Sequence, residues 1–344
     1  MTDPQPAITF AEIVEMVRRF PGPDLEAGTA VRERDRLLTK PRGALGQLEE
    51  IAYWMACWQG KAPPECRHPR VAVYAGNHGV ATARPVSAYP VEVTAQMVAN
   101  FQNGGAAVNA LCHIADSDLR VYELDLDNPT ADFTTGPAMS EQACAHAIAY
   151  GMMGVDQGLH LLSLGEMGIG NTTSAAALCC ALLGGEPEDW VGPGTDVEGE
   201  RLAAKHQAVT QALAANAAGL TDPLQILRCL GGFELAAIVG AIIAARLART
   251  PVLLDGFACS AAAAVLWAID PKALDHCLVG HVSAEPGHRR LLDRIGRHGI
   301  LDLGMRLGEG SGAALAMNVV RAAVDCHADM ATFDDAGVAT KLGD

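Results

Sequence analysis

Two glutamates stand among glycines at two separate places in this sequence. Glu166 lies in the segment GEMGIGNTT at 165–173, and Glu309 lies in MRLGEGSGAALA at 305–316. In each segment, residues that favour a helix follow the glycines. Glycine lets the backbone approach a ligand closely, and the start of a helix offers unpaired N–H groups that suit a phosphate. The two segments therefore predict an anionic substrate held beside two carboxylates.

These residues also have ordinary structural explanations. Glu309 could be a solvated loop glutamate near a helix start, where the helix dipole favours negative charge. Glu166 could be a turn residue, while Asn171 and Thr172 could be N-caps, although capping is compatible with phosphate binding. The functional hypothesis for Glu309 is a general base, which requires partial desolvation to raise its pKa. The flanking glycines favour function, because each costs backbone entropy and needs a reason.

Other polar residues belong to weaker motifs. Gly194 and the downstream Lys205 belong to a proline–glycine loop and the helix after it, features that are commonly plain surface. Ser87 and Tyr89 lie in a turn before a helix, where capping is the structural alternative. His78 follows the end of a strand, and a structural histidine fits that position as well as a catalytic one.

Short apolar strands alternate with helices along most of the chain. We expect strands at 70–75, 119–126, 159–164, 251–254 and 277–282, and helices at 8–20, 32–38, 45–58, 140–151, after 171 and at 312–324. This alternation predicts βαβ units and a parallel sheet covered by helices on both faces. Ligands bind such sheets at the carboxyl ends of the strands. The loops at 76–79, 165–173, 255–257 and 283–288 are expected there.

We therefore predict an α/β protein with a parallel-sheet domain and a small helical subdomain. Residues 1–65 would supply the N-terminal helices of the subdomain, and residues 66–305 would form the nucleotide-binding sheet domain. Residues 306–344 would contain the glutamate loop and the C-terminal helix that completes the subdomain.

Composition narrows the possible partners. The 344 residues are 50% hydrophobic, which is enough for a large core, and the formal net charge is −15. That charge argues against nucleic acid or an anionic membrane, because phosphate groups need basic surfaces. The apolar stretch 235–247 is too short to span a bilayer. Ten scattered cysteines without a C-x-x-C pair, and no secretory signal, favour reduced thiols and a cytoplasmic protein.

Several common catalytic motifs are absent from the sequence. It contains no G-x-x-x-x-G-K-[ST], H-E-x-x-H or G-x-S-x-G segment, and no cysteine spacing typical of a zinc site. The glycines at 165–170 reverse the spacing of the dinucleotide fingerprint, which disfavours a dehydrogenase. We expect no metal and no cofactor.

Nine short motifs occur in order between residues 40 and 338. They are KPRGALG at 40–46, NHGV at 77–80, VSAYP at 86–90, GPAM at 136–139, GEMGIGNTT at 165–173, GGF at 231–233, LLDGF at 253–257, SAE at 283–285 and RLGEGSG at 306–312. With these motifs the sequence resembles the nicotinate-nucleotide–dimethylbenzimidazole phosphoribosyltransferases, which build the lower nucleotide loop of cobalamin. One such motif would be weak, whereas nine in order are specific.

The resemblance implies an activity and an assembly. The reaction would move 5-phosphoribosyl from nicotinate mononucleotide to dimethylbenzimidazole, giving α-ribazole 5′-phosphate and nicotinate. The sheet domain would be Rossmann-like. The protein would be a homodimer in which the small helical domain helps to close the partner's active site.

The resemblance also implies roles for particular residues. Glu309 would be the general base that takes the benzimidazole N–H proton, and Glu166 would stabilise positive charge at the anomeric carbon. The nucleotide phosphate and ribose would be held by Gly168, Gly170, Asn171, Thr172, Gly194, Lys205, Asp255, Gly256 and Ser283. The benzimidazole would be bound by Ser87, Tyr89 and Met167. Many relatives have aspartate where this chain has Asn77, so an acidic role there stays open.

Two other functions compete with this hypothesis. A phosphoribosyltransferase of the same fold could use a different acceptor, such as adenine or a phenol, because the base-pocket segment varies within the family. A non-catalytic protein that sequesters benzimidazole would keep an apolar pocket but would lose the base. The presence of both Glu166 and Glu309 counts against such a binder.

Overall fold

Six parallel strands form the centre of the molecule. In the computed structural model, which describes residues 8–340, these are β1 (Pro69–Ala75), β2 (Asp118–Glu123), β3 (Leu161–Met167), β4 (Val252–Leu254), β5 (Cys277–His281) and β6 (Gly299–Leu301). Their order across the sheet is β2-β1-β3-β4-β5-β6. The chain reverses its direction of travel between β1 and β3, which is where ligands bind in sheets of this kind.

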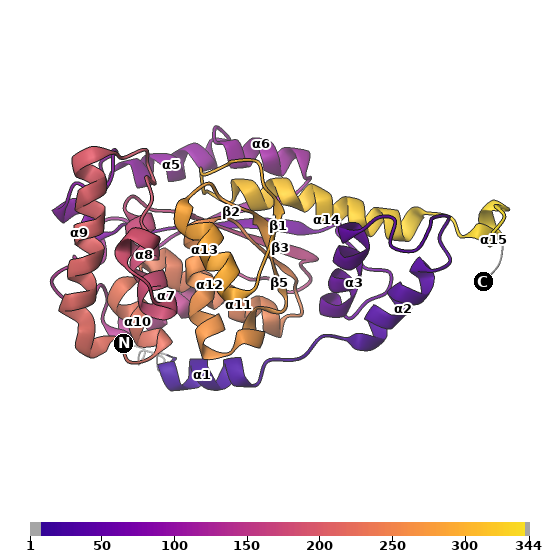
Figure 1. The fold of residues 1–344 in the computed structure, drawn as a ribbon, viewed down its shortest axis with the longest axis horizontal. Coiled ribbons are helices and arrows are strands. Elements are labelled where there is room, and N and C mark those ends of the chain that lie inside the picture. Colours follow the sequence, from indigo (N-terminus) through magenta and orange to yellow (C-terminus); the bar gives the residue numbers. More distant parts are fainter. Residues whose placement is uncertain (1–7, 341–344) are drawn as a thin grey trace, which may run out of the picture.

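Helices cover both faces of the sheet (Figure 1). One face packs against α7 (Glu141–Met153), α8 (Asn171–Leu183), α10 (Pro223–Leu230), α11 (Phe233–Leu247), α12 (Phe257–Ile269) and α13 (Pro286–Ile295), with α9 (Gly199–Asn216) outside α8. The other packs against α3 (Gln47–Gln59), α5 (Val93–Gln102), α6 (Ala107–Ile114) and α14 (Ser311–Asp329). Ala72 and Tyr74 face the first layer, whereas Val71 and Val73 face the second. Burial on both faces explains the near-continuous apolar strands and confirms the Rossmann-like α/β prediction.

Two of the elements that differ from the sequence prediction are helix α2 and strand β6. The charged helix expected at 32–38 is α2 (Leu25–Asp35), which begins earlier because Asp24 caps it through the N–H of Ala27 at 2.9 Å. Gly28 lies inside this helix because a Cβ there would come within 2.5 Å of the Cys57 sulfur. Strand β6 was not predicted, since its three half-buried residues at the sheet edge leave no periodic signal.

Helices α2 and α3 lie beside the second half of α14 at one end of the molecule (Figure 1). Helix α2 packs on α3, and α3 lies along α14. The Arg34 guanidinium donates to the carbonyls of His327, Ala328 and Met330 at the far end of α14. In contrast, α1 (Phe10–Arg18) packs with the opposite layer, near α12. The domain boundaries at residues 65 and 305 stay a prediction.

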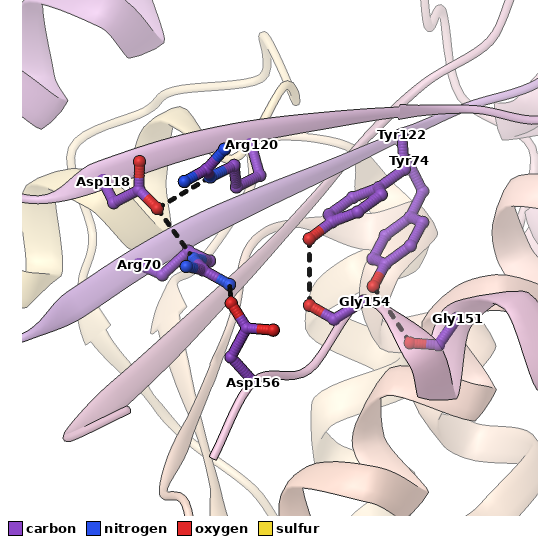
Figure 2. Close-up of polar contacts among 8 residues, drawn as sticks. All are labelled: Arg70, Tyr74, Asp118, Arg120, Tyr122, Gly151, Gly154 and Asp156. Carbon is purple, nitrogen blue, oxygen red and sulfur yellow. Dashed lines mark hydrogen bonds and ion pairs between the residues drawn. The ribbon is translucent and has the colours of Figure 1, made fainter. Parts of the chain in front are cut away.

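The amino ends of β1 and β2 are tied to the loop after α7 (Figure 2). Arg70 pairs with Asp118 at 2.9 Å and with Asp156 at 2.7 Å. Nearby, Tyr74 donates to the carbonyl of Gly151 and Tyr122 to that of Gly154, with the two rings stacked 5.0 Å apart. The Arg70 ion pairs lie at the amino ends of the strands, whereas Tyr74 and Tyr122 stand one residue before the carboxyl ends of β1 and β2 and bind the last turn of α7 and the residue after it. Together these contacts fix α7 and the loop after it to the sheet.

Helices α7 and α11 cross with their backbones in contact. A Cβ on Gly151 would lie 1.8 Å from the carbonyl oxygen of Ala237, and a Cβ on Gly240 would lie 1.8 Å from that of Ile148. Only glycine fits at these two positions, because neither contact atom belongs to a side chain that could move aside.

Gly240→Ala should therefore lower the free energy of unfolding, although alanine is the better helix former. Overpacking of a core typically costs about 1–3 kcal/mol, against a gain of about 1 kcal/mol in helix propensity. Urea unfolding followed by circular dichroism measures the difference. Gly136→Ala is the matched control, because no heavy atom lies within 4 Å of a Cβ there. Equal unfolding midpoints for the two variants would contradict the packing argument.

Candidate active site

A cavity of about 870 Å³ opens at the carboxyl ends of the central strands. Its wall includes most of the residues that the sequence singled out. These are Glu166, Met167, Gly168, Gly170, Asn171, Thr172, Gly194, Gly256, Ser283, Glu309, Ser87 and Tyr89. The structure therefore brings the two glycine–glutamate segments and the two turn segments into one site.

The two glutamate segments touch through their backbones. A Cβ on Gly165 would lie 2.4 Å from the nitrogen of Gly310, and a Cβ on Gly308 would lie 2.5 Å from the Glu166 carboxylate. Gly308 and Gly310 also have φ of +81° and +76°, which side chains rarely adopt. The glycines are thus needed for the close approach that places both glutamates on one cavity.

Glu309 combines burial with a left-handed backbone. Its φ is +64°, and only 7% of the residue is exposed. Burial, with a smaller contribution from the charge of Asp255, raises the pKa of Glu309 to about 7. A carboxyl group that titrates near neutral pH has the basicity expected of a general base.

Glu166 is the penultimate residue of strand β3 and is also buried. Burial raises the pKa of Glu166 to about 8, and the charges of Asp255 and Glu234 act in the same direction. The Asn171 amide donates to the Glu166 carboxylate, which partly offsets this rise. The charge of Glu309 makes a smaller contribution in the same upward direction.

Asp255 does not line the cavity. It is fully buried and accepts hydrogen bonds from the N–H groups of Gly310 at 3.2 Å and Ala313 at 2.8 Å. It thereby fixes the first turn of α14, directly after Glu309. The side chain that sequence analysis assigned to the nucleotide therefore supports the glutamate loop from behind.

Lys205 also lies behind the wall. Its ammonium donates to the Thr172 hydroxyl at 3.1 Å and to the Gly192 carbonyl at 2.6 Å, and the residue is 1% exposed. Burial lowers the pKa of Lys205 to about 8, opposed by the charge of Glu285. A Cβ on Gly194 would lie 2.9 Å from this ammonium, so only a thin wall of backbone separates Lys205 from the cavity.

Two helices begin at the cavity without a side-chain cap. Helix α8 follows Gly170, whose φ is +97°, and α12 follows Gly256. Gly168 approaches the backbone at β1 so closely that a Cβ would lie 2.4 Å from the Gly76 carbonyl. Uncapped helix starts with glycine in front of them suit an anion such as phosphate.

Part of the cavity lining is apolar. Its lining includes Val86, Val93, Met97, Ile169 and Leu307, together with the predicted Met167 and Tyr89. Val93 and Met97 were missed because they recur at helical spacing on α5, a pattern that also describes a helix face in the core. Glu285 and Arg306 were missed too, although both lie in motifs that carry the resemblance.

His78 and Asn77 are not on the cavity wall. His78 pairs with Glu234 at 2.7 Å, and both side chains are fully buried beneath the 168–170 loop. The Asn77 amide donates to the carbonyl of Leu126 at 2.9 Å. An aspartate could not donate that bond, so Asn77 is suited to a structural role in this chain.

Comparisons with known proteins agree over nearly the whole chain. A phosphoribosyltransferase family model matches residues 20–338. Nicotinate-nucleotide–dimethylbenzimidazole phosphoribosyltransferases of Brucella canis and Brucella suis are each 57% identical over 331 residues, 96% of this chain and 97% of theirs. The chain belongs to the nicotinate-nucleotide–dimethylbenzimidazole phosphoribosyltransferase family. The enzyme of this name from Thermus thermophilus has a crystal structure with a TM-score of 0.84 at 42% identity, covering 92% of this chain and 100% of that one.

The predicted enzyme class and fold are thereby confirmed for this phosphoribosyltransferase. None of the helices within residues 8–340 is both long and apolar enough to cross a membrane. Over the same residues, no group of three or more histidine, cysteine, aspartate or glutamate side chains is arranged to hold a metal ion. The roles of the individual site residues stay predictions.

The buried Glu166 should make the stability of this phosphoribosyltransferase depend on pH. Its pKa is about 8 when folded against 4.5 for the free side chain, so the folded protein binds the extra proton between these values. Stability is therefore greatest at and below pH 4.5 for this group and falls as pH rises towards 8, by up to about 1.4 kcal/mol per pH unit.

Glu166→Gln removes this titration while keeping an oxygen that can accept from Asn171. We expect the variant to match the wild type near pH 5 and to be more stable at pH 8, as measured by urea unfolding at both pH values. Glu33→Gln changes an exposed glutamate of α2 and serves as the control. A difference between Glu166→Gln and wild type that is the same at both pH values would exclude the raised pKa.

Proposed function

We propose that this enzyme transfers 5-phosphoribosyl from nicotinate mononucleotide to 5,6-dimethylbenzimidazole in cobalamin biosynthesis, giving α-ribazole 5′-phosphate and nicotinate. The names of relatives that match 96% of the chain support the substrates. The structural observation that carries the proposal is the pair Glu166 and Glu309, two buried carboxyls with raised pKa values on one cavity.

One base and one charge stabiliser are what this reaction needs. The bond from the anomeric carbon to the pyridinium nitrogen breaks, and its electron pair neutralises that nitrogen, so the leaving group needs no acid. A benzimidazole nitrogen forms the new bond to the anomeric carbon, and the ring gives up its N–H proton. Glu309 accepts this proton, a contribution that is typically worth about 10²–10⁴ in rate.

Glu166 acts on the sugar. Positive charge develops at the anomeric carbon as the pyridinium leaves, and an ionised carboxylate fixed beside it lowers the energy of that state. The pyridinium of the bound substrate is itself a cation, which favours the ionised form of Glu166. Substrate binding therefore counteracts the burial that raises the pKa of this residue in the free enzyme.

The remaining lining fits the two substrates. The uncapped starts of α8 and α12 supply N–H donors and Ser283 a hydroxyl donor for the phosphate and ribose, and Gly194 lies against Thr172 at the start of α8. The apolar part around Met167, with Val93 and Met97, accepts the flat hydrocarbon body of dimethylbenzimidazole. Ser87 and Tyr89 lie at its edge, and Tyr89 is 57% exposed.

We also propose that the chain works as a homodimer in the cytoplasm. Leu307 and Tyr89 both line the cavity, yet each is more than half exposed, so a partner subunit could cover them. All ten cysteines are free thiols, which fits a reducing compartment.

The purified protein should convert nicotinate mononucleotide and dimethylbenzimidazole to α-ribazole 5′-phosphate with an equal amount of nicotinate. Chromatography of both bases over time measures the two products together. Nicotinate release with adenine or a phenol, but none with dimethylbenzimidazole, would show that the acceptor is one of those compounds and not dimethylbenzimidazole. Failure to form any ribosylated product would refute the transferase.

Glu309→Gln should reduce turnover by at least about 10²-fold, because the amide cannot accept the acceptor's proton. Nucleotide binding should persist, since Glu309 acts on the benzimidazole, and calorimetry with nicotinate mononucleotide measures it. Glu92→Gln, at an exposed position ahead of α5, should keep wild-type turnover. Full activity in Glu309→Gln would contradict the assignment of Glu309 as the general base.

A further inference from the structure

Arg306 carries the one basic side chain among the described residues that line the cavity. Its guanidinium donates to the Gly194 carbonyl at 2.9 Å and contacts the Asp196 carboxylate at 2.9 Å. Four other lining residues are acidic, namely Glu166, Asp196, Glu285 and Glu309. Acidic side chains outnumber the basic one on this wall, so the phosphate of an anionic nucleotide needs a cation that is free to meet it.

The phosphate of a nucleotide needs more positive charge than Lys205 alone can provide. A phosphate monoester carries about −1.5 to −2 charges at pH 7. Lys205 is buried behind the wall, and its ammonium is already bonded to Thr172 and Gly192. Burial also lowers the pKa of this lysine to about 8. A second cation at the same end of the cavity would complete the charge balance.

Arg306 and Lys205 converge on one residue, Gly194. The ammonium of Lys205 and the hydroxyl of Thr172 lie 2.9 and 2.7 Å from the place of a Cβ on this glycine. Arg306 donates to the carbonyl of the same glycine in an exposed hydrogen bond. The arginine is therefore at the end of the cavity where the donors for phosphate gather.

The turn at 193–197 does not depend on Arg306 for its position. The turn is closed by the N–H of Val197, which donates to the Pro193 carbonyl at 3.0 Å. The Thr195 hydroxyl bonds the Ser87 hydroxyl and the Ala88 N–H, each at 3.0 Å. The Glu285 carboxylate accepts from the Gly194 N–H at 2.9 Å. With these contacts in place, the guanidinium can leave without releasing the turn.

The ion pair itself is exposed, with 39% of the Arg306 side chain and 79% of the Asp196 side chain accessible to water. Exposed pairs contribute little, whereas a guanidinium and a phosphate form two strong charge-assisted bonds. We propose that Arg306 exchanges Asp196 for the phosphate of the bound nucleotide, so that Asp196 is a built-in competitor for the phosphate site. This inference rests on the proposed function.

The exchange predicts effects of opposite sign for the two partners of the ion pair. Arg306→Gln removes a phosphate contact and should raise the Kd for nicotinate mononucleotide by about tenfold or more, with Arg306→Lys in between. Asp196→Asn removes the competitor and should lower that Kd a few-fold. Asparagine tolerates the φ of +70° found at Asp196, so the turn is preserved.

Calorimetry of the full chain with nicotinate mononucleotide gives these constants, and steady-state kinetics should show the change in KM with kcat altered less. Nicotinate riboside, which lacks the phosphate, tests the source of the effect. Its affinity should be the same for wild type, Arg306→Gln and Asp196→Asn. If the substitutions changed the affinity for the riboside as well, Arg306 would act on a part of the nucleotide other than its phosphate, and the proposal would be overturned.

Arg289→Gln is the matched control, because Arg289 and Asp302 form an exposed ion pair of the same 2.9 Å length away from the cavity wall. It should leave the nucleotide Kd unchanged. Weakened binding in both Arg306→Gln and Asp196→Asn would mean that the pair is a structural latch, and an unchanged Kd in Arg306→Gln would also refute the exchange. In either case product formation by the wild type would leave the proposed transferase standing.

Discussion

The backbone of β3 touches the backbone of the 308–310 loop, and the shared cavity of the two glutamates depends on that contact. Gly165 has no room for a side chain because Gly310 lies against its Cα. If either residue carried a Cβ, α14 would move away from the sheet and Glu309 would move with it. The separation of the Glu166 and Glu309 carboxyls therefore depends on a contact between backbone atoms, which adjust less easily than side chains.

Burial then raises the pKa values of the two glutamates that this contact brings together. Glu309 and Glu166 lie near enough to Asp255 for its charge to raise both pKa values, while Asp255 itself holds the start of α14. One buried aspartate therefore positions the glutamate loop and also makes its carboxyl more basic. Burial raises the pKa of Asp255, and the two backbone N–H groups that donate to it at the start of a helix offset part of that rise.

Features that depend on neighbouring residues in the sequence could be predicted, whereas contacts between distant segments could not. The strand before Glu166 is a continuous apolar run, and the glycines around Glu309 indicate a close approach, so the fold class and both glutamates could be predicted. Whether Lys205 faces the cavity or lies behind its wall depends on how α9 packs, which its own sequence does not determine. The ion pair of Arg306 with Asp196 joins loops 110 residues apart and leaves no trace in either motif.

Helix α14 joins the candidate base at its first turn to the α2–α3 segment near its other end. Its 19 residues make a rod about 28 Å long. Close to Glu309 the rod rests on β5, where Gly280 lies against the backbone of Ala313. The same helix packs on the sheet at this end and on α3 further along. Because one continuous helix makes both sets of contacts, a tilt of α14 at Glu309 would also displace α2 and α3.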